Sequence, residues 1–424
     1  MTLEEIYALY RQNPQVETDT RKLKPGSLFF ALKGPNFNGN AFVQQALDAG
    51  AAYCIIDEEA YAVAGKTVVV PDVLESLQQL AKYHRQQFAI PFLAITGSNG
   101  KTTTKELIHA VLSSTYKTYT TEGNLNNHIG VPLTLLKIKT DARLAIIEMG
   151  ANHQREIAAY CEIAQPTHGL ITNCGKAHLE GFGGEEGVRK GKGELFDYLR
   201  THNGAAFIMQ DYEYLFQMSR GITSLFTYGT LNGSVTGTVL QSDPFLKVGF
   251  SAGFDGAIQT RLVGSYNLPN VLAAVAVGTY FKVPEKSIQQ ALEGYVPSNS
   301  RSQLMERDTN KIILDAYNAN PSSMKLAIEN FAHTIGENKI LVLGAMAELG
   351  TESLQEHQNI IDEIRKYNWK EVVLVGGDFT KLDHPYRQFK TAAEAGNALQ
   401  ETKDAFLLIK GSRSTGMEAV LNYL

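Results

Sequence analysis

Short apolar runs alternate with amphipathic segments along most of the chain. The first part begins with a helix-like segment and continues, in order, with a strand, a Gly- and Asn-rich turn, an amphipathic helix and a second strand, at residues 27–32, 34–39, 41–49 and 53–57. This order predicts a small α/β unit over residues 1–87. Ala89-Ile90-Pro91 marks its boundary with the next unit.

The second part of the chain repeats strand and helix patterns. Residues 92–96 are an apolar run that ends abruptly in a Gly-rich turn, and residues 144–147 and 169–172 are further short buried strands. Such alternation predicts a parallel sheet with crossover helices. Residues 225–262 are rich in Thr, Gly and Ser with strand-like alternation, which predicts a β-rich insertion of antiparallel hairpins at the sheet edge.

A helix at residues 267–280 and a linker at 296–300 end this second domain, which we place at 88–297. Residues 298–424 predict a third domain of alternating strands and helices, at 312–315, 322–333, 340–343, 352–366, 372–375, 392–400 and 405–409. The predicted fold class is therefore α/β, with three domains, parallel sheets and a Rossmann-like C-terminal domain.

Composition narrows the class of protein. Of 424 residues, 44% are hydrophobic and 20% charged, which excludes disordered, collagen-like and coiled-coil chains. The 39 basic against 44 acidic residues are evenly mixed, which argues against a nucleic-acid-coating surface. The acidic first residues do not fit a secretory signal, and no apolar run approaches the length of a membrane span. We expect a soluble cytoplasmic protein with reduced cysteines.

The most specific local signal is Thr96-Gly-Ser-Asn-Gly-Lys-Thr-Thr103, where a strand runs into a glycine turn and then a helix. Backbone N–H groups of such a turn point at an anion, and the helix N-terminus adds its dipole. Lys101 would reach the β- and γ-phosphates, and Thr102 would bind Mg²⁺. The alternative is an ordinary turn with an exposed lysine, but motif and context agree on a nucleotide site.

Two further residues follow predicted strands. Glu148 ends the strand at 144–147, where a parallel sheet places its ligands, although a surface carboxylate would fit the same position. His178 follows the strand at 169–172, and a lone loop histidine is more often structural than catalytic. Lys190 and Lys192 lie on different faces of the next helix, and periodicity alone predicts both to be solvated.

Together these motifs resemble those of the Mur ligases. The resemblance runs nearly end to end, from Asp19-Thr-Arg-Lys-Leu-Lys-Pro-Gly onward, and is strongest in Thr96-Gly-Ser-Asn-Gly-Lys-Thr-Thr, Gly123-Asn-Leu-Asn-Asn-His-Ile-Gly-Val-Pro132, Glu148-Met-Gly-Ala-Asn-His, Ala177-His-Leu-Glu-Gly-Phe-Gly, Lys192-Gly-Glu-Leu-Phe, Asp315-Ala-Tyr-Asn-Ala-Asn-Pro and Lys410-Gly-Ser-Arg. Within the family, the motifs are most similar to the branch that adds D-alanyl-D-alanine to UDP-N-acetylmuramoyl-tripeptide. The resemblance implies a UDP-sugar domain, a central ATPase domain with the phosphate loop, and a C-terminal domain that closes on the amino-acid substrate.

The resemblance also implies roles for individual residues. ATP would contact Gly97, Asn99, Gly100, Lys101, Thr102, Thr103, Asn267, Asn270, Arg301 and Asp315. Magnesium would be held by Thr102, Glu148, His178 and Lys192, the last carrying CO₂ as a carbamate. The catalytic set would be Lys101, Glu148, His178, Lys192 and Arg301. Without the family, Asn267 would be an N-cap for the helix that follows.

The resemblance also implies which residues lie near the substrates. Thr20, Arg21, Asn124, Asn127 and His128 resemble positions near the UDP-sugar, and Ser412 and Arg413 resemble positions near the dipeptide. The chain departs from the family pattern at Asn38, Asn40, Tyr266, Ala345 and Ala347.

The expected reaction transfers the γ-phosphoryl group of ATP to a carboxylate, and an amine then displaces phosphate from the acyl phosphate. We expect a monomer that acts on small molecules in peptidoglycan synthesis, without nucleic-acid or membrane partners. Three alternatives remain from the sequence: a Mur or folylpolyglutamate-type ligase that adds a single amino acid, a nucleotide-switched binding protein, and a non-catalytic scaffold. The general base for the amine and the third residue of the acceptor peptide are not predicted.

Overall fold

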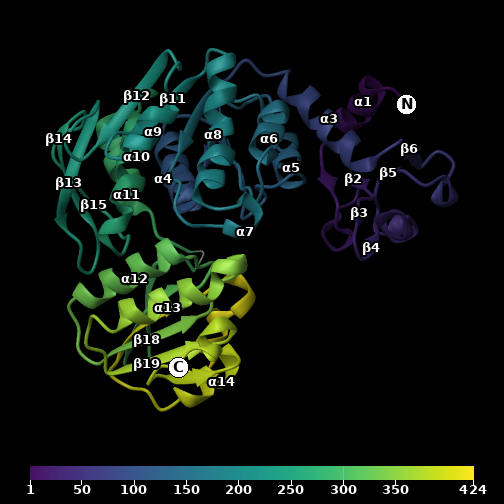
Figure 1. Cartoon of the computed structure of the whole chain (residues 1–424). Helices are drawn as coiled ribbons and strands as arrows, with labels where there is room; N and C mark the ends of the chain where they lie inside the picture. Colours follow the sequence, from purple (N-terminus) through teal and green to yellow (C-terminus); the bar gives the residue numbers. More distant parts are fainter. Residues whose placement is uncertain (299) are drawn as a thin grey trace.

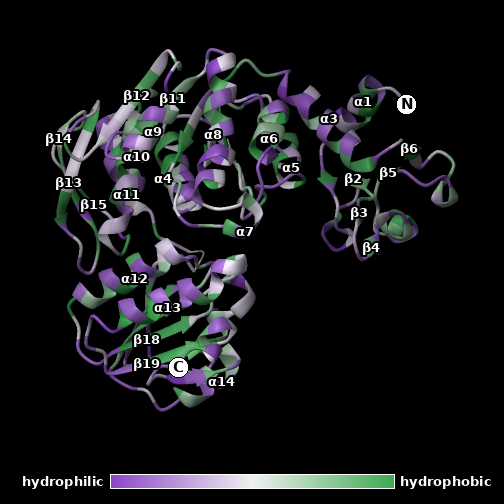
Figure 2. Ribbon diagram, viewed as in Figure 1, coloured by the Kyte–Doolittle hydropathy of each residue, from purple (hydrophilic) through white to green (hydrophobic). Residues whose placement is uncertain are grey.

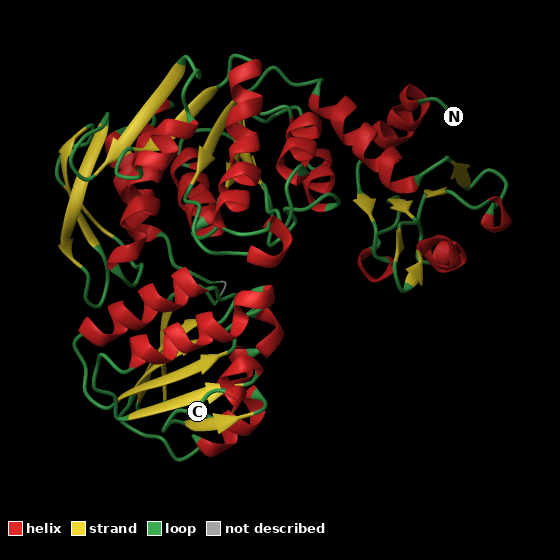
Figure 3. Ribbon diagram, viewed as in Figure 1, coloured by secondary structure: helices red, strands yellow, loops and turns green. Residues whose placement is uncertain are grey.

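The structure is a computed structural model of the chain and describes residues 1–298 and 300–424. Three larger β-sheets follow one another along the chain, each with helices packed against it (Figures 1 and 3). The predicted α/β class with three successive units is confirmed. The domain boundaries stay predictions, and Asn299, in the predicted linker, lies outside the described residues.

The N-terminal sheet is parallel, with the order β1-β2-β5-β6. Its strands are β1 (Val16–Glu17), β2 (Leu28–Phe30), β5 (Tyr53–Ile56) and β6 (Thr67–Val69). The predicted turn at 34–39 carries a small antiparallel pair, β3 (Lys33–Gly34) and β4 (Phe37–Asn38). The helices are α1 (Leu3–Gln12), α2 (Val43–Asp48) and α3 (Val73–Arg85), and α3 packs against the central part of the chain.

The central sheet has the order β15-β14-β13-β12-β11-β10-β7-β9-β8. Its strands are β7 (Phe92–Thr96), β8 (Thr118–Thr120), β9 (Leu144–Glu148), β10 (His168–Ile171), β11 (Ala205–Met209), β12 (Ser224–Gly229), β13 (Val235–Gln241), β14 (Lys247–Ala252) and β15 (Ala257–Gln259). The strands from β8 to β13 pair in parallel, and β7, β9 and β11 are buried throughout, as their apolar runs predict.

The segment at 225–262 behaves as predicted in part. Strands β13, β14 and β15 form antiparallel pairs at the sheet edge. Strand β12 instead pairs in parallel with β11, so it continues the main sheet. Its half-buried side chains resemble those of an edge hairpin, which is why alternation alone assigned it to the same group.

Helices cover both faces of the central sheet. They are α4 (Lys101–Ser113), α5 (Gly130–Leu136), α6 (Glu156–Ala164), α7 (Leu179–Phe182), α8 (Glu185–Thr201), α9 (Glu213–Met218), α10 (Leu268–Tyr280) and α11 (Glu285–Gly294). Helix α10 is almost entirely buried and packs against α4, which fixes the helix that follows the phosphate loop. The three cysteines are free and buried, and in the described ranges we find no helix with the length and apolarity that a bilayer crossing requires.

The C-terminal sheet has the order β16-β17-β21-β18-β19-β20, with only the β16–β17 pair antiparallel. The strands are β16 (Gln303–Arg307), β17 (Asn310–Asp315), β18 (Lys339–Gly344), β19 (Glu371–Val375), β20 (Arg387–Phe389) and β21 (Phe406–Lys410), and the helices are α12 (Pro321–His333), α13 (Ser353–Ile364) and α14 (Ala392–Ala398). Apolar residues concentrate on the inner strands, while the helices alternate apolar and polar faces (Figure 2). Helices α12 and α13 lie between this sheet and the central part (Figure 1).

Candidate active site

A cavity of about 760 Å³ lies where the loops after β7, β9 and β10 meet the C-terminal part of the chain. Open parallel sheets bind their ligands beyond the carboxyl ends of the strands, and this cavity is in that place. The charged and histidine side chains that line it are Lys101, His128, Glu148, Glu156, His178, Arg301, Asp315, Glu348 and Lys410.

The phosphate loop has the predicted form. Strand β7 ends at Thr96 and helix α4 begins at Lys101. Gly97 and Gly100 have φ of +143° and +79°, conformations that L side chains rarely adopt. A Cβ on Gly97 would lie 2.0 Å from the Thr172 hydroxyl oxygen, so the close approach of the loop to β10 requires glycine.

The loop is fastened by the segment after β10. Asn173 accepts from the Ser98 N–H through its carbonyl oxygen at 2.9 Å and from the Asn99 N–H through its side chain at 3.0 Å. The Thr172 hydroxyl donates to the Asn99 carbonyl at 2.6 Å. Sequence analysis assigned no role to Asn173; its position directly after a strand that neighbours β7 is the signal that could have found it.

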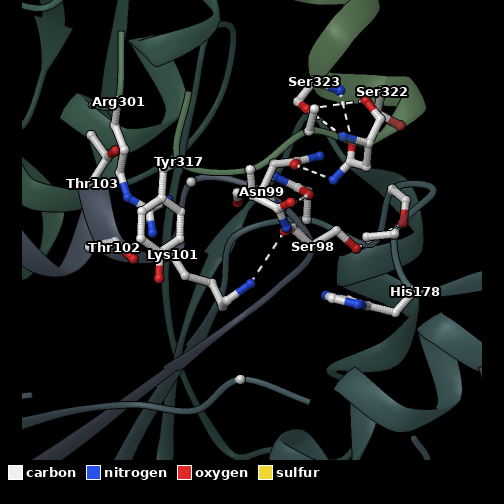
Figure 4. Close-up of a pocket in the computed structure, with 18 of the residues that line it drawn as sticks. Ser98, Asn99, Lys101, Thr102, Thr103, His178, Arg301, Tyr317, Ser322 and Ser323 are labelled. Atoms are coloured by element: carbon white, nitrogen blue, oxygen red, sulfur yellow. Dashed lines mark hydrogen bonds between the residues drawn. The ribbon is translucent and has the colours of Figure 1, made fainter. Parts of the chain in front are cut away.

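Lys101 points back along its own loop. Its ammonium donates to the Gly97 carbonyl at 2.7 Å. It also donates to the Ser98 carbonyl at 3.3 Å (Figure 4). Burial lowers the pKa of Lys101 to about 8; the charge of Glu148 acts against this shift and that of Arg301 adds to it. An anion in the cavity would favour the protonated amine and would compete with the two carbonyls for it.

Glu148 is buried, with 1% of its surface exposed, so it is not a surface carboxylate. The Thr102 hydroxyl and the Asn126 amide donate to its Oε1 at 3.1 and 2.8 Å. Its Oε2 is buried without a hydrogen-bond partner. A buried carboxylate oxygen that lacks a donor is costly unless a cation neutralises it, and Mg²⁺ prefers oxygen ligands. Thr102 and Glu148 therefore fit a magnesium site.

His178 and Lys192 are held by other partners. His178 precedes α7, and its Nδ1 lies 2.5 Å from Oε2 of Glu348, in the C-terminal part. Lys192 donates to the Ala151 carbonyl at 2.9 Å. Over residues 1–298 and 300–424, no three His, Cys, Asp or Glu side chains converge as a metal site, so the metal roles of His178 and Lys192 stay predictions.

Lys190 and Lys192 differ sharply in burial. Lys190 is exposed, as periodicity predicts, whereas only 1% of the surface of Lys192 is exposed. The prediction of a solvated Lys192 is therefore wrong, because α8 packs this face against α7, where the amine lies 4.8 Å from the Phe182 ring centroid. Burial lowers the pKa of Lys192 to about 7, so much of the amine is neutral near neutral pH.

Asn267 and Asn270 form a buried chain of hydrogen bonds behind the loop. The Thr104 hydroxyl donates to Asn270 Oδ1 at 3.0 Å, and the Asn270 amide donates to Asn267 Oδ1 at 2.8 Å. The Asn267 amide then donates to the Val263 carbonyl at 2.8 Å. Asn267 occupies the N-cap position of α10, as predicted, but its side chain makes no capping hydrogen bond, because its amide is turned toward the preceding turn. Both asparagines border the cavity.

The C-terminal part contributes a cluster of charged and aromatic residues. The Arg301 guanidinium lies 3.7 Å from the Tyr317 ring centroid, and its buried Nε has no hydrogen-bond partner (Figure 4). Asp315 is paired with the buried Lys410 at 2.5 Å and accepts from the Ser302 N–H at 3.2 Å. Sequence analysis assigned Lys410 no role beyond its place in Lys410-Gly-Ser-Arg. The structure shows that it pairs with Asp315.

The predicted substrate residues divide into two groups. Asn124, Asn127 and His128 line the cavity, whereas Thr20, Arg21, Ser412 and Arg413 do not. Arg21 pairs with Asp19 at 2.7 Å, and Arg413 pairs with Glu418 at 2.9 Å. The buried Ser412 hydroxyl donates to the Ala345 carbonyl at 2.6 Å. Their substrate roles stay predictions.

Besides the pair of His178 and Glu348, further contacts join the central and C-terminal parts around the cavity. The Asn320 amide donates to the Asn99 side chain at 2.7 Å, which brings α12 to the phosphate loop. Lys176 pairs with the buried Glu356 of α13 at 2.7 Å. The Tyr266 hydroxyl shares a hydrogen bond with Ser302 at 2.8 Å. The two parts therefore close over the loop in this structure.

Comparison with known proteins places the chain in a family. Three family models match it in order: "Mur ligase family, catalytic domain" at residues 15–85, "Mur ligase middle domain" at 95–278 and "Mur ligase, glutamate ligase domain" at 300–414. The chain is 38% identical to the UDP-N-acetylmuramoyl-tripeptide–D-alanyl-D-alanine ligase of Bacillus subtilis, over 97% of this chain and 95% of the relative. It is 35% identical to the Escherichia coli enzyme of the same name, over 96% and 93%.

The comparison with solved structures gives the same result. MurF of Acinetobacter baumannii superposes with a TM-score of 0.89 at 30% identity, over 99% of this chain and 98% of the other. MurF of Thermotoga maritima in complex with ADP gives 0.86 at 25% identity, over 97% of both chains. Folylpolyglutamate synthase of Mycobacterium tuberculosis, at 14% identity and a TM-score of 0.62, covers 82% of this chain and 94% of its own and shares the fold. From the order of the matched models and the near-complete alignment, we conclude that the chain belongs to the Mur ligase family.

Proposed function

We propose that the chain is an ATP-dependent ligase that joins D-alanyl-D-alanine to UDP-N-acetylmuramoyl-tripeptide in peptidoglycan precursor synthesis. One observation carries the proposal: a phosphate loop, a buried carboxylate oxygen without a donor and an arginine from the C-terminal part border one cavity. The curated relatives that align over nearly the whole chain carry this activity in their names. We propose that it acts as a cytoplasmic monomer, since ATP is available there and one chain forms the whole cavity.

The reaction needs an activated acyl group because a free carboxylate has no adequate leaving group. A carboxylate oxygen of the tripeptide attacks the γ-phosphorus of ATP, the bond to the bridging oxygen breaks, and ADP leaves. The amine nitrogen of the dipeptide then attacks the acyl carbon, phosphate departs with the bonding electrons, and one proton is lost from nitrogen. Lys101 and Arg301 would neutralise the negative charge of the phosphoryl group. Such charge neutralisation, together with positioning, supplies most of the catalysis of phosphoryl transfer.

Magnesium would be held by Thr102 and Glu148, with His178 and Lys192 completing the set. When bound, it neutralises the charge of the phosphates and orients them. Asn267, Asn270 and Asp315 would lie along the nucleoside, and Gly97, Asn99, Gly100 and Thr103 would surround the phosphates. Contacts such as Asn320–Asn99 would keep water from the acyl phosphate.

We propose that Lys192 carries CO₂. Its amine is buried and donates to the Ala151 carbonyl, and no ion pair with a carboxylate is found for it among the described residues. The charges of Glu156 and Glu194 favour the protonated amine, but burial outweighs them and lowers its pKa to about 7. A neutral amine adds CO₂ to form a carbamate with release of one proton, which converts the lysine into an anionic oxygen ligand. We expect a carbamate ¹³C signal from the protein in ¹³C-bicarbonate that is absent from Lys192→Met. The same signal in Lys192→Met, or none in either protein, would exclude this assignment.

Product mass tests the main proposal. The protein is incubated with ATP, Mg²⁺, D-alanyl-D-alanine and the UDP-muramoyl-tripeptide in its diaminopimelate and lysine forms, with Lys101→Met as the inactive control. We expect a product heavier by one dipeptide less one water, with one ADP per product. In parallel reactions a single amino acid replaces the dipeptide, and a product formed only in those reactions would favour another ligase of the family. ADP release without any acceptor amine would favour a nucleotide-switched protein.

A further inference from the structure

Glu348 faces the cavity from the C-terminal part of the chain. It follows β18 at the carboxyl end of the strand, and half of its side-chain surface is exposed. Its φ of +61° is unusual for a residue with a side chain and costs about 1–2 kcal/mol. The loop therefore holds the backbone at Glu348 in this conformation at an energetic cost.

Four carboxylates line the cavity, and three of them are already engaged. Glu148 accepts from Thr102 and Asn126 and belongs to the proposed magnesium site. Glu156 accepts from the N–H groups of Asn152 and His153 at 2.7 and 3.0 Å, and Asp315 is paired with Lys410.

Glu348 differs because its one described side-chain partner is His178, which meets Oε2. We propose that Glu348 binds the ammonium group of the incoming dipeptide and so places the amine beside the reacting acyl carbon. This assignment rests on the proposed function and names a substrate-binding residue within it. ATP and the UDP group bring negative charge, which a half-exposed carboxylate repels, whereas the reacting end of the dipeptide arrives as a cation. Neighbouring His178 lies in the same cavity as Glu148 and Lys101, where the acyl phosphate would form.

A purely structural role for Glu348 is the competing explanation, because the His178 contact joins two parts of the chain. The structure offers a matched control. Glu356 makes the comparable interdomain pair with Lys176 at 2.7 Å but does not line the cavity. Glu356→Gln therefore weakens the same interface without changing the charge that a ligand meets.

The test compares wild type, Glu348→Gln and Glu356→Gln in steady-state kinetics. Loss of one charge-assisted hydrogen bond should raise the KM for D-alanyl-D-alanine about 10–100-fold in Glu348→Gln. The KM values for ATP and for the UDP-tripeptide should change less than about twofold, and a titration with an ATP analogue should show that the variant still binds nucleotide. Glu356→Gln should affect the three substrates alike. The analogue D-lactoyl-D-alanine, in which a neutral hydroxyl replaces the ammonium, should inhibit wild type and Glu348→Gln with the same Ki.

Several outcomes would overturn the assignment. An unchanged dipeptide KM in Glu348→Gln, an equal loss for the neutral analogue, or a rise confined to the UDP-tripeptide would each do so. If wild type ligates the dipeptide and Glu348→Gln gives one of these three contrary results, only the assignment of Glu348 fails. If wild type forms no dipeptide product, the proposed function fails and the assignment with it.

Discussion

Replacement of Asn126 by leucine tests how Glu148, the carboxylate of the proposed magnesium site, is held. The Asn126 amide donates to Glu148 Oε1 at 2.8 Å, and the Thr102 hydroxyl donates to the same oxygen at 3.1 Å. Because both donors bind Oε1, the Oε2 atom of Glu148 has no hydrogen-bond donor and is available to a cation. Leucine has the same branching and the same number of heavy side-chain atoms as asparagine but no donor, so the carboxylate would be oriented by Thr102 alone.

The expected magnitude follows from the lost hydrogen bond. A hydrogen bond to a charged group contributes about 1.5–3 kcal/mol, and each 1.4 kcal/mol is about tenfold in affinity. Part of that free-energy loss destabilises the metal-free protein as well as the metal complex, so it cancels in the affinity. Only the lost orientation of the Glu148 carboxylate weakens metal binding. Removal of groups that orient a metal ligand generally costs about 10–100-fold in metal affinity. We therefore expect Asn126→Leu to bind divalent metal about tenfold more weakly.

The assay is Mn²⁺ binding, followed by electron paramagnetic resonance in the presence of a non-hydrolysable ATP analogue. Asn127→Ala is the matched control. The neighbouring Asn127 side chain accepts from the N–H groups of Ile129 and Gly130 at 3.1 and 2.8 Å at the start of α5 and does not contact Glu148. It should lose about 1 kcal/mol of stability and keep its metal affinity. Equal Mn²⁺ affinity in Asn126→Leu and wild type, or equal weakening in both variants, would refute the reasoning.

Two further predictions concern the loop and the core. In Gly100→Ala, the φ of +79° and a Cβ 2.6 Å from Asn270 Oδ1 should destabilise the loop by about 1–2 kcal/mol. The affinity for an ATP analogue, measured by calorimetry, should fall about tenfold. In His168→Gln, acid destabilisation should shrink. Burial lowers the pKa of His168 from 6.5 to about 4, so the unfolded chain takes up the proton first and stability is lost as the pH falls below 6.5. By urea denaturation, wild type should lose about 2 kcal/mol more than this variant between pH 7 and pH 5.

Each of these predictions has a contrary result. Unchanged nucleotide affinity in Gly100→Ala would mean that the loop adapts without Asn270. A pH dependence in His168→Gln equal to that of wild type would mean that the buried imidazole beside Tyr280, 3.2 Å from its hydroxyl oxygen, does take up a proton in the folded chain.

The phosphate loop could be predicted because its determinants are local. Two glycines with positive φ, a buried strand before them and a helix at Lys101 all lie within ten residues. The same holds for Glu148, whose burial follows from the apolar strand that it ends. In both cases strand period and turn chemistry dictate the backbone, and the backbone places the side chain.

Residues whose roles depend on distant contacts could not be predicted from the residues alone. Lys190 and Lys192 have the same chemistry and similar neighbours in sequence, and only the packing of α8 against Phe182 and Ala151 separates them. The short strands β16 and β20 contain no fully buried residue, so they lack an apolar pattern of their own. The pairing of His178 with Glu348 joins separate sheets, and no local rule relates their positions.

The cations of the cavity differ in how readily they could exchange their partners for a phosphate. Lys101 is held by two neutral carbonyls, and Arg301 lies against the Tyr317 ring with an unpartnered Nε, so an anion would replace weak partners with a stronger one. Lys410 is buried against Asp315, and its departure would leave a carboxylate without its counter-charge. This difference supports the proposal that Lys101 and Arg301 meet the nucleotide phosphates, while Lys410 stays paired with Asp315.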